Sequence, residues 1–340
     1  MPLHYHTGAL EEHHLVRRSV GLFDISHMGR LLFRGANAAA ELDRLISSDV
    51  LGLTEGKSSY GLLCREDGTV IDDVFVYRFE DAYLVVINAA NRDRDVSWIR
   101  EHIDDSVEWS DTSEAISMVA IQGPLAIDVV DALSDGQAGA IPRFGCGTVT
   151  VAGHRMRCGR TGYTGEDGVE LFPESADVER VWDSFFEHAA AKQIDLGPCG
   201  LASRDSLRFE PGFHLYGHEI RDDITPVEAR LKWACHLDRD FIGRDAIARR
   251  AEEGPARRLA TIVLRDKGVP REGYALTDGE GTEIGEVTSG MLAPTVGEYA
   301  ANVFVDTGYS KVGTRLAVNI RGREKQAEVV KRPLYKPRYK

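Results

Sequence analysis

The sequence predicts an α+β protein with more than one domain. Predicted strands and helices alternate irregularly through the first part of the chain, hairpin signals accompany them, and short strands at regular spacing follow residue 256. A doubly wound sheet would require a regular alternation of strand and helix instead. The chain has 340 residues, which is enough for two or three domains.

The first elements follow from hydrophobic spacing. A helix is predicted over residues 9–20, a strand over 30–34 and a helix over 37–46, whose leucines share one face. Residues 60–79, "YGLLCREDGTVIDDVFVYRF", predict a β-hairpin, because apolar strands flank the turn dipeptide Asp67-Gly68.

Further strand–helix units follow the hairpin. Residues 82–91 predict a strand that leads into a helix, and residues 117–124, "SMVAIQGP", predict a strand with a helix start at its end. Another strand, "GVELF" (168–172), precedes a helix over 175–192. These elements place the predicted α+β region at residues 1–248.

The composition changes at residues 249–258, "RRAEEGPARR", which predict a charged Gly-Pro linker. Beyond it lie six short strand-like segments, "LATIVLR", "YALT", "EIGEVTSG", "YAANVFV", "RLAVNI" and "KQAEVV". Such spacing is typical of a small all-β barrel or sandwich. We therefore expect a C-terminal β domain over residues 256–340.

Composition excludes several classes of function. The net charge of −13 argues against nonspecific nucleic-acid binding, which depends on basic side chains. No apolar run approaches the roughly 20 residues of a membrane span, so we expect no membrane association and a cytoplasmic location. The five cysteines contain no CxxC pair, and we expect no metal site. The basic tail over 331–340 is either a solvated segment or a contact for an anionic partner.

The first chemical motif is "VIDDVFVY" (70–77). Strand alternation places Asp72 on one face with the valines and Asp73 on the other with Phe75 and Tyr77. Whichever face is buried, one carboxylate lies among apolar side chains. Such a group is either fixed by hydrogen bonds or kept for function.

The second motif is "RTGYTGEDGVELF" (160–172). Its three glycines allow unusual backbone angles and the close approach of a ligand, and they alternate with Tyr163 and several carboxylates. The segment lacks the GK[ST] of a phosphate loop. An acidic, aromatic loop suits an uncharged heterocycle with amino and N–H donors, although a purely structural loop and turn remains the alternative.

The third motif lies in residues 200–220, where Arg204, Asp205, Arg208 and Glu210 are closely spaced. Pairing within one helix is the structural interpretation. The functional interpretation is a fork-shaped arginine that binds a ligand carboxylate or carbonyl.

These segments together closely resemble the T-protein family of the glycine cleavage system. The resemblance is carried in order by "GLFDISHMG", "DGTVIDDVFVYR", "VINAAN", "AIQGPLA", "GRTGYTGEDGVEL", "ASRDSLRFEPGFHLYGHEI", "TPVEARLKWACHLDRDFIGRDAI", "GVPREGYAL" and "GEVTSGMLAPTVG". It implies a three-part cloverleaf around a central folate channel. Two intertwined α+β parts would lie in residues 1–248, and the barrel would follow. Family members usually have a further segment ahead of "MPLHY".

The resemblance implies a tetrahydrofolate-dependent aminomethyltransferase. Its donor would be the aminomethyl group on the dihydrolipoyl arm of the H-protein, and its products 5,10-methylenetetrahydrofolate and ammonia. One alternative is a tetrahydrofolate-dependent demethylase of a small O-, S- or N-methyl compound. A non-catalytic folate-binding relative in iron–sulfur assembly is disfavoured, because Asp73 and the whole "GYTGEDGVE" run are retained.

The resemblance also implies roles for individual residues. Asp73, the second aspartate of the family's DD motif, would be catalytic, and Glu170 would bind the pterin edge of the folate. The remaining positions expected around the folate are Met28, Tyr60, Tyr77, Asn88, Tyr163, Arg204 and Phe213.

Overall fold

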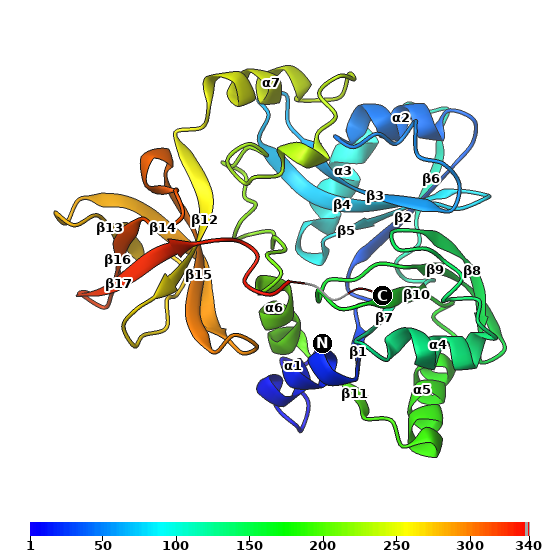
Figure 1. Ribbon diagram of the computed structural model, residues 1–340. Coiled ribbons are helices and arrows are strands. Elements are labelled where there is room, and N and C mark those ends of the chain that lie inside the picture. The colour runs from blue at the N-terminus through cyan, green and yellow to red at the C-terminus, as the bar shows by residue number, and fades with distance from the viewer. Residues whose placement is uncertain (337–338, 340) are drawn as a thin grey trace. The chain divides into compact units, whose positions relative to one another are not determined.

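The computed structural model describes residues 1–336 and residue 339, and it confirms the α+β class (Figure 1). The chain forms two compact units. The first consists of Met1–Gly61, Asp73–Leu207 and the extreme C-terminus, and the second of Leu62–Asp72 and Arg208–Lys336. The domain boundaries expected at residues 248 and 256 stay a prediction.

The first unit contains a six-stranded sheet with the order β11-β1-β7-β10-β9-β8. Its strands are β1 (Val20–Asp24), β7 (Val119–Gln122), β8 (Cys146–Val151), β9 (His154–Gly159), β10 (Gly168–Phe172) and β11 (Leu196–Pro198). The pair β1–β11 is parallel, whereas β1–β7, β7–β10, β10–β9 and β9–β8 are antiparallel.

A five-stranded sheet has the order β3-β4-β5-β2-β6. Its strands are β2 (Gly29–Arg34), β3 (Lys57–Cys64), β4 (Val70–Arg78), β5 (Tyr83–Ile87) and β6 (Glu108–Asp111). The turn predicted between β3 and β4 is confirmed. Gly68 has a φ of +84°, and its N–H donates to the carbonyl of Arg65 (2.9 Å). Glycine adopts this left-handed conformation without steric cost.

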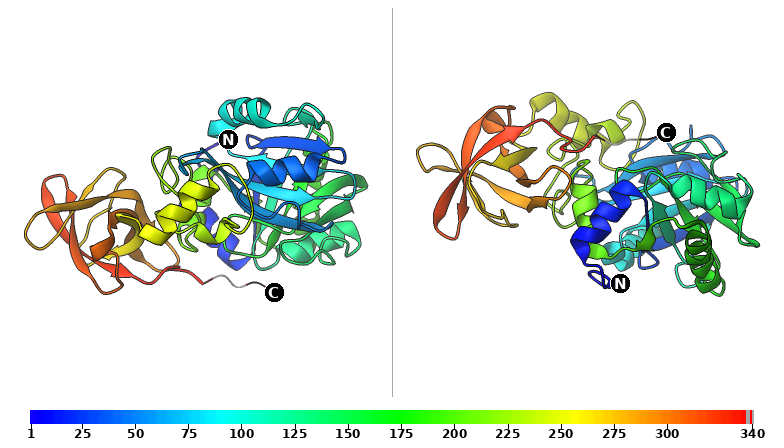
Figure 2. Two further views of the ribbon diagram at one scale, coloured as in Figure 1. Left: turned by 90° about the horizontal axis from the view of Figure 1, so that it is seen from above. Right: turned by 60° about the horizontal axis from the view of Figure 1, so that its bottom comes forward.

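Helices lie between the strands along the chain. They are α1 (Ala9–Arg18), α2 (Ala38–Leu45), α3 (Arg92–His102), α4 (Ala126–Ser134), α5 (Val178–Lys192), α6 (Leu201–Phe209) and α7 (Arg244–Glu253), with short 3-10 turns η1 (Ala89–Asn91), η2 (Lys232–Ala234) and η3 (Thr307–Tyr309). Helix α4 packs on β7, β8 and β10, and α5 packs on α4 and β11 (Figure 1). Helix α1 runs beside α6, as the views in Figure 2 also show.

The two sheets of the first unit share a core. On β10, Val169 and Leu171 face the helices α4 and α5. The alternate positions, Glu170 and Phe172, point to the opposite face, and there Phe172 packs in a cluster with Tyr77 of β4. One carboxylate of the sequence motif is therefore directed toward the neighbouring sheet.

The second unit contains a closed barrel with the strand order β12-β15-β14-β13-β16-β17. Its strands are β12 (Arg257–Leu264), β13 (Ala275–Thr277), β14 (Glu283–Ala293), β15 (Glu298–Asp306), β16 (Arg315–Ile320) and β17 (Arg323–Val330). The predicted C-terminal barrel is confirmed. The predicted linker over 249–258 is wrong in its first half, because α7 continues to Glu253 and only residues 254–256 connect it to β12.

A buried ion pair connects the segment after α6 to the barrel. Arg208 donates to Glu219 (2.8 Å) and to the Ser289 hydroxyl (2.9 Å), and Thr288 donates to the other oxygen of Glu219 (2.8 Å). Burial alone raises the pKa of Glu219, but Arg208 and these hydroxyls outweigh it and lower the pKa to about 2. Arg208 therefore pairs with a carboxylate beyond its own helix.

Part of the basic tail also contacts this segment. The Arg332 guanidinium donates to the carbonyl of Gly212, and the Tyr335 N–H donates to the carbonyl of Glu210 (2.9 Å). These residues are not simply solvated. The tail positions 337, 338 and 340, part of the contact expected for an anionic partner, lie outside the described residues.

The five cysteines are all buried, and none of them forms a disulfide. Burial raises the pKa of the Cys146 thiol to about 12 and holds the pKa of Cys158 and Cys199 well above its usual value. Among the described residues, none of the helices has both the length and the apolar composition that crossing a bilayer requires.

His214 gives the second unit a pH-dependent stability. Burial, followed by the charge of Arg332, lowers its pKa from 6.5 to about 3, and its Nε2 lies 2.7 Å from the carbonyl of Ala229. Between these two values the unfolded chain binds a proton that the folded chain does not. The contribution of His214 to stability is therefore complete above pH 6.5 and falls as the pH drops toward 3, by at most about 1.4 kcal/mol per pH unit.

We expect His214→Gln, which keeps an N–H donor but cannot titrate, to flatten the fall in stability between pH 6.5 and 4. Urea unfolding of the full chain and of this variant at four pH values measures the difference in slope. Equal slopes for both proteins would show that His214 is not the titrating group.

Candidate functional site

The two aspartates of β4 lie in different environments. Asp72 is fully buried (0% exposed) on the face that carries Val74 and Val76, whereas Asp73 is half-buried on the opposite face with Tyr77. Asp72 is therefore the aspartate that lies buried among apolar side chains. Asp73 is the more exposed of the two carboxylates.

Two neutral side chains donate hydrogen bonds to the carboxylate of Asp73. The Tyr60 hydroxyl, on β3, donates to Oδ2 (3.1 Å), and the Asn88 amide, directly after β5, donates to Oδ1 (2.8 Å). Three of the predicted site residues are thus brought together by hydrogen bonds to one carboxylate.

Glu170 is held in a similar way at the other end of β4. Its Oε2 accepts hydrogen bonds from Tyr77 (2.7 Å) and Thr161 (2.5 Å), and Glu170 is buried. Burial, and then the charge of Glu170, raise the pKa of Tyr77 well above its usual value, so the phenol remains a donor. Both hydrogen bonds that described residues make to this carboxylate are accepted by Oε2. The other oxygen, Oε1, remains for a ligand.

The two carboxylates border one row of side chains on β4, because Asp73 belongs to this row and Glu170 of β10 contacts Tyr77 in it. Asp73 and Tyr77 are four residues apart on the same face, which corresponds to about 13 Å along a strand. Phe75 lies between them, with its ring 5.1 Å from that of Tyr77 and 6.5 Å from that of Tyr60. The side chains between the two carboxylates are therefore aromatic.

The loop between β1 and β2 supplies Met28, which packs against the cluster that contains Tyr77. Arg30 fixes this loop by donating to the carbonyls of Ser26 (3.0 Å) and Met28. Burial, followed by the charge of Arg92, lowers the pKa of Arg30 to about 10, so its guanidinium stays charged at neutral pH.

Arg204 and Tyr163 form a stacked pair. The guanidinium carbon of Arg204, on α6, lies 4.7 Å from the centre of the Tyr163 ring. Burial lowers the pKa of Arg204, and Tyr163 and Glu170 act against this. Phe213 belongs to the second unit, so its predicted place beside the folate stays a prediction.

The glycines of the 160–172 segment allow close contacts with other parts of the chain. A Cβ on Gly162 would lie 1.9 Å from the Gln122 side chain, and one on Gly168 would lie 2.2 Å from the carbonyl of Ile121. Gln122 donates to the carbonyl of Thr161 (3.0 Å). The expected close approach is therefore between parts of the chain, and Gly165, with a φ of +80°, supplies the turn.

The acidic character of the same loop is largely neutralised. Glu166 pairs with Arg17 (3.0 Å), and Asp167 forms a two-pronged pair with Arg160 (3.0 and 2.7 Å). Glu170 differs, because the partners it has among the described residues are hydroxyl groups. Its charge is the one in this loop that a ligand with N–H donors would meet.

Sequence reasoning missed Thr161 and Phe75 as site residues. Thr161 lies in the same motif as Glu170, but its contact with Oε2 depends on the pairing of β9 with β10. Phe75 could have been found, because alternation places it between Asp73 and Tyr77 on one face of the strand.

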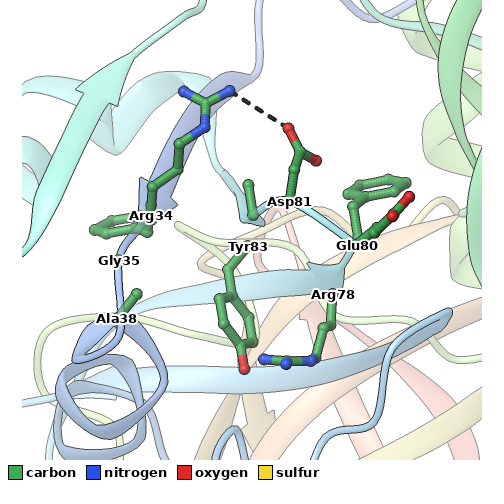
Figure 3. Close-up of a pocket in the computed structure, with 10 residues that line it drawn as sticks. Arg34, Gly35, Ala38, Arg78, Glu80, Asp81 and Tyr83 are labelled. Carbon is green, nitrogen blue, oxygen red and sulfur yellow. Dashed lines mark ion pairs between the residues drawn. The ribbon is translucent and has the colours of Figure 1, made fainter.

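Elsewhere, the described residues form a separate cavity and no metal-binding group. In the described part of the chain, no group of three His, Cys, Asp or Glu side chains could hold a metal ion. Figure 3 shows a separate cavity of about 110 Å³, and none of the predicted site residues lines it. There Arg34 pairs with Asp81 (3.5 Å), and the Arg78 guanidinium lies 4.7 Å from the centre of the Tyr83 ring.

Comparisons with known proteins identify the family of the chain. Residues 1–239 match the GCVT N-terminal domain, and residues 257–336 match the glycine cleavage T-protein C-terminal barrel domain. An aminomethyltransferase of Geobacillus sp. (strain WCH70) is 41% identical over 330 residues, covering 96% of this chain and 90% of the relative. One of Symbiobacterium thermophilum is 42% identical, covering 99% and 91%.

A solved structure extends the agreement to three dimensions. The crystal structure of the glycine cleavage system aminomethyltransferase T from Bartonella henselae superposes with a TM-score of 0.93 at 29% identity, covering 100% of this chain and 92% of that chain. Both domain models, the full-length relatives and the fold agree, and the chain therefore belongs to the glycine cleavage T-protein family.

Proposed function

We propose that this chain is the aminomethyltransferase of a glycine cleavage system. It takes the one-carbon unit from an aminomethyl-dihydrolipoyl carrier, the H-protein, and transfers it to tetrahydrofolate with release of ammonia. The match of nearly the whole chain to curated aminomethyltransferases carries this proposal. These relatives give no support to the demethylase alternative. A cytoplasmic location is part of the same proposal.

The residues of the first unit fit a folate. A pterin edge presents amino and N–H donors, and the buried carboxylate of Glu170 has Oε1 available to accept them. Flat rings pack well against aromatic side chains, which Phe75 and Tyr163 supply. Met28 adds a polarisable, adaptable side chain to the same surface. The site thus combines one specific polar reader with apolar walls, as small-molecule sites commonly do.

Asp73 supplies the catalytic charge. Positive charge develops on the carbon as it leaves its donor, and a fixed carboxylate stabilises that charge without reorganising. Tyr60 and Asn88 orient the two oxygens, so the carboxylate is in place before the substrates arrive. Asp73 can also hold the proton that the acceptor nitrogen loses. Tetrahydrofolate supplies the nucleophilic nitrogens that receive the carbon.

The proposed activity predicts that aminomethylated H-protein and tetrahydrofolate together yield ammonia and methylenetetrahydrofolate. Rates are measured at low and high salt, because an electrostatically guided encounter slows as salt rises. A control reaction omits tetrahydrofolate. No ammonia at either salt concentration, with methyltetrahydrofolate formed from a small methylated compound, would support the demethylase instead.

Glu170→Ala is expected to weaken tetrahydrofolate binding by about 1.5–3 kcal/mol, the range for a hydrogen bond to a charged group. Calorimetry measures the affinity, and circular dichroism checks that the variant is folded. Glu179→Ala, at an exposed position on α5, is the matched control. Unchanged folate affinity in folded Glu170→Ala would remove Glu170 from the pterin site.

Asp73→Asn keeps the shape of the side chain and removes its charge. We expect turnover to fall by about 10²-fold or more, with little change in folate affinity, because the charge acts mainly in the transition state. Steady-state kinetics and calorimetry on the same preparation separate the two quantities. Asp105→Asn, at an exposed position, is the control. Near-normal turnover of Asp73→Asn would leave Asp73 as a residue that only lines the site.

A further inference from the structure

One arginine outside the predicted site connects two of its parts. Arg17 lies near the end of α1, and its side chain is 8% exposed. Nη1 donates to the carbonyl of Thr164 (2.7 Å) and to the carboxylate of Glu166 (3.0 Å), and Nη2 donates to the carbonyl of Leu207 (3.3 Å). A single guanidinium thus binds the 160–167 loop and helix α6 at the same time.

The two segments that Arg17 joins carry a stacked pair of site residues. Tyr163 directly precedes Thr164 in the loop, and Arg204 lies one helical turn before Leu207 on α6. The Arg204 guanidinium lies 4.7 Å from the centre of the Tyr163 ring. Each member of the pair is therefore within one turn of a backbone carbonyl that Arg17 holds.

A second hydrogen bond joins α1 to α6. Nδ1 of His13 lies 2.8 Å from the hydroxyl of Ser206, one helical turn before Arg17 on the same side of α1. Figure 2 shows the two helices side by side. Helix α1 is thus a fixed support for α6, and Arg17 extends that support to the loop.

We infer that Arg17 is a positioning residue that sets the distance between Tyr163 and Arg204 and so shapes the folate site. The inference rests on the proposed function. A planar guanidinium has five donors in a rigid fork and can bind acceptors on two segments, whereas a lysine ammonium acts as a compact charge on a flexible stem. Removing the fork frees the loop from α6 and leaves Asp73, Tyr60 and Asn88 in place.

The test is Arg17→Lys, which keeps the charge near Glu166 and removes the fork. We expect the KM and the Kd for tetrahydrofolate to rise about tenfold, because small misplacements of binding groups carry costs of this size. We expect kcat to change less than about twofold, since the interaction is lost equally before and during the chemical step. Calorimetry with tetrahydrofolate alone measures the Kd independently of turnover.

Two further variants separate positioning from general stability. Arg18→Gln changes the neighbouring arginine, which is 48% exposed and pairs with Glu11 and Asp195 at the surface, and it should leave the Kd unchanged. Glu166→Gln keeps an acceptor oxygen and both carbonyl contacts of Arg17, and should raise the Kd less than about threefold. A Glu166→Gln effect as large as that of Arg17→Lys would overturn the inference, because charge and not bridging would then matter.

A double-mutant cycle gives the decisive readout. If Arg17 acts through Arg204, the effects of Arg17→Lys and Arg204→Lys on the Kd are not additive, and the double variant binds little worse than Arg204→Lys. Additive effects, or an Arg17→Lys protein with wild-type Kd, would overturn the inference. Turnover by the wild-type chain is measured first. Its absence would refute the proposed function, whereas normal wild-type turnover with a silent Arg17→Lys would refute only the role of Arg17.

Discussion

The site depends on the hydrogen bonds of one carboxylate, Glu170, which is buried between two β-sheets. Glu170 belongs to β10 of the six-stranded sheet and Tyr77 to β4 of the five-stranded sheet, so the hydrogen bond between them (2.7 Å) fixes one sheet against the other. A buried charge costs several kcal/mol unless donors satisfy it. The hydroxyls of Tyr77 and Thr161 meet that requirement at Oε2. The contact between the sheets thus uses Oε2, and the folate site proposed above would use Oε1.

Two kinds of group bind the carboxylates in and around the site. Arginines bind the carboxylates that shape the chain, as Arg160 binds Asp167 and Arg208 binds Glu219. Hydroxyl and amide groups hold the two carboxylates proposed for function, Asp73 and Glu170. A guanidinium adds a positive charge beside the carboxylate, whereas a hydroxyl or amide donor orients the carboxylate without adding a charge. The kind of partner therefore separates the two carboxylates proposed for function from Asp167 and Glu219.

The local sequence pattern predicts much of this arrangement. The rest depends on contacts between residues that lie far apart in the sequence. Alternation along β4 separated Asp72 from Asp73, but which of the two is buried depends on what packs on each face of the strand. The barrel followed from regular strand spacing and a turn at each end. The glycines of the loop were interpreted as room for a ligand, because their true neighbour, Gln122, lies about 40 residues earlier. The end of α7 was missed because its charged residues resemble a linker, although Ala, Arg and Glu are good helix formers.

The burial of all five cysteines has a practical consequence for spectroscopy. Thiol reagents attack the thiolate, and burial disfavours that form, as the raised pKa of Cys146 illustrates. The native protein should therefore be almost inert to maleimide dyes and nitroxide labels without any cysteine being replaced. One new cysteine on an exposed helix of the first unit and another on a barrel hairpin would then accept a donor and an acceptor dye. Energy transfer between the two dyes would then report on the native protein in solution.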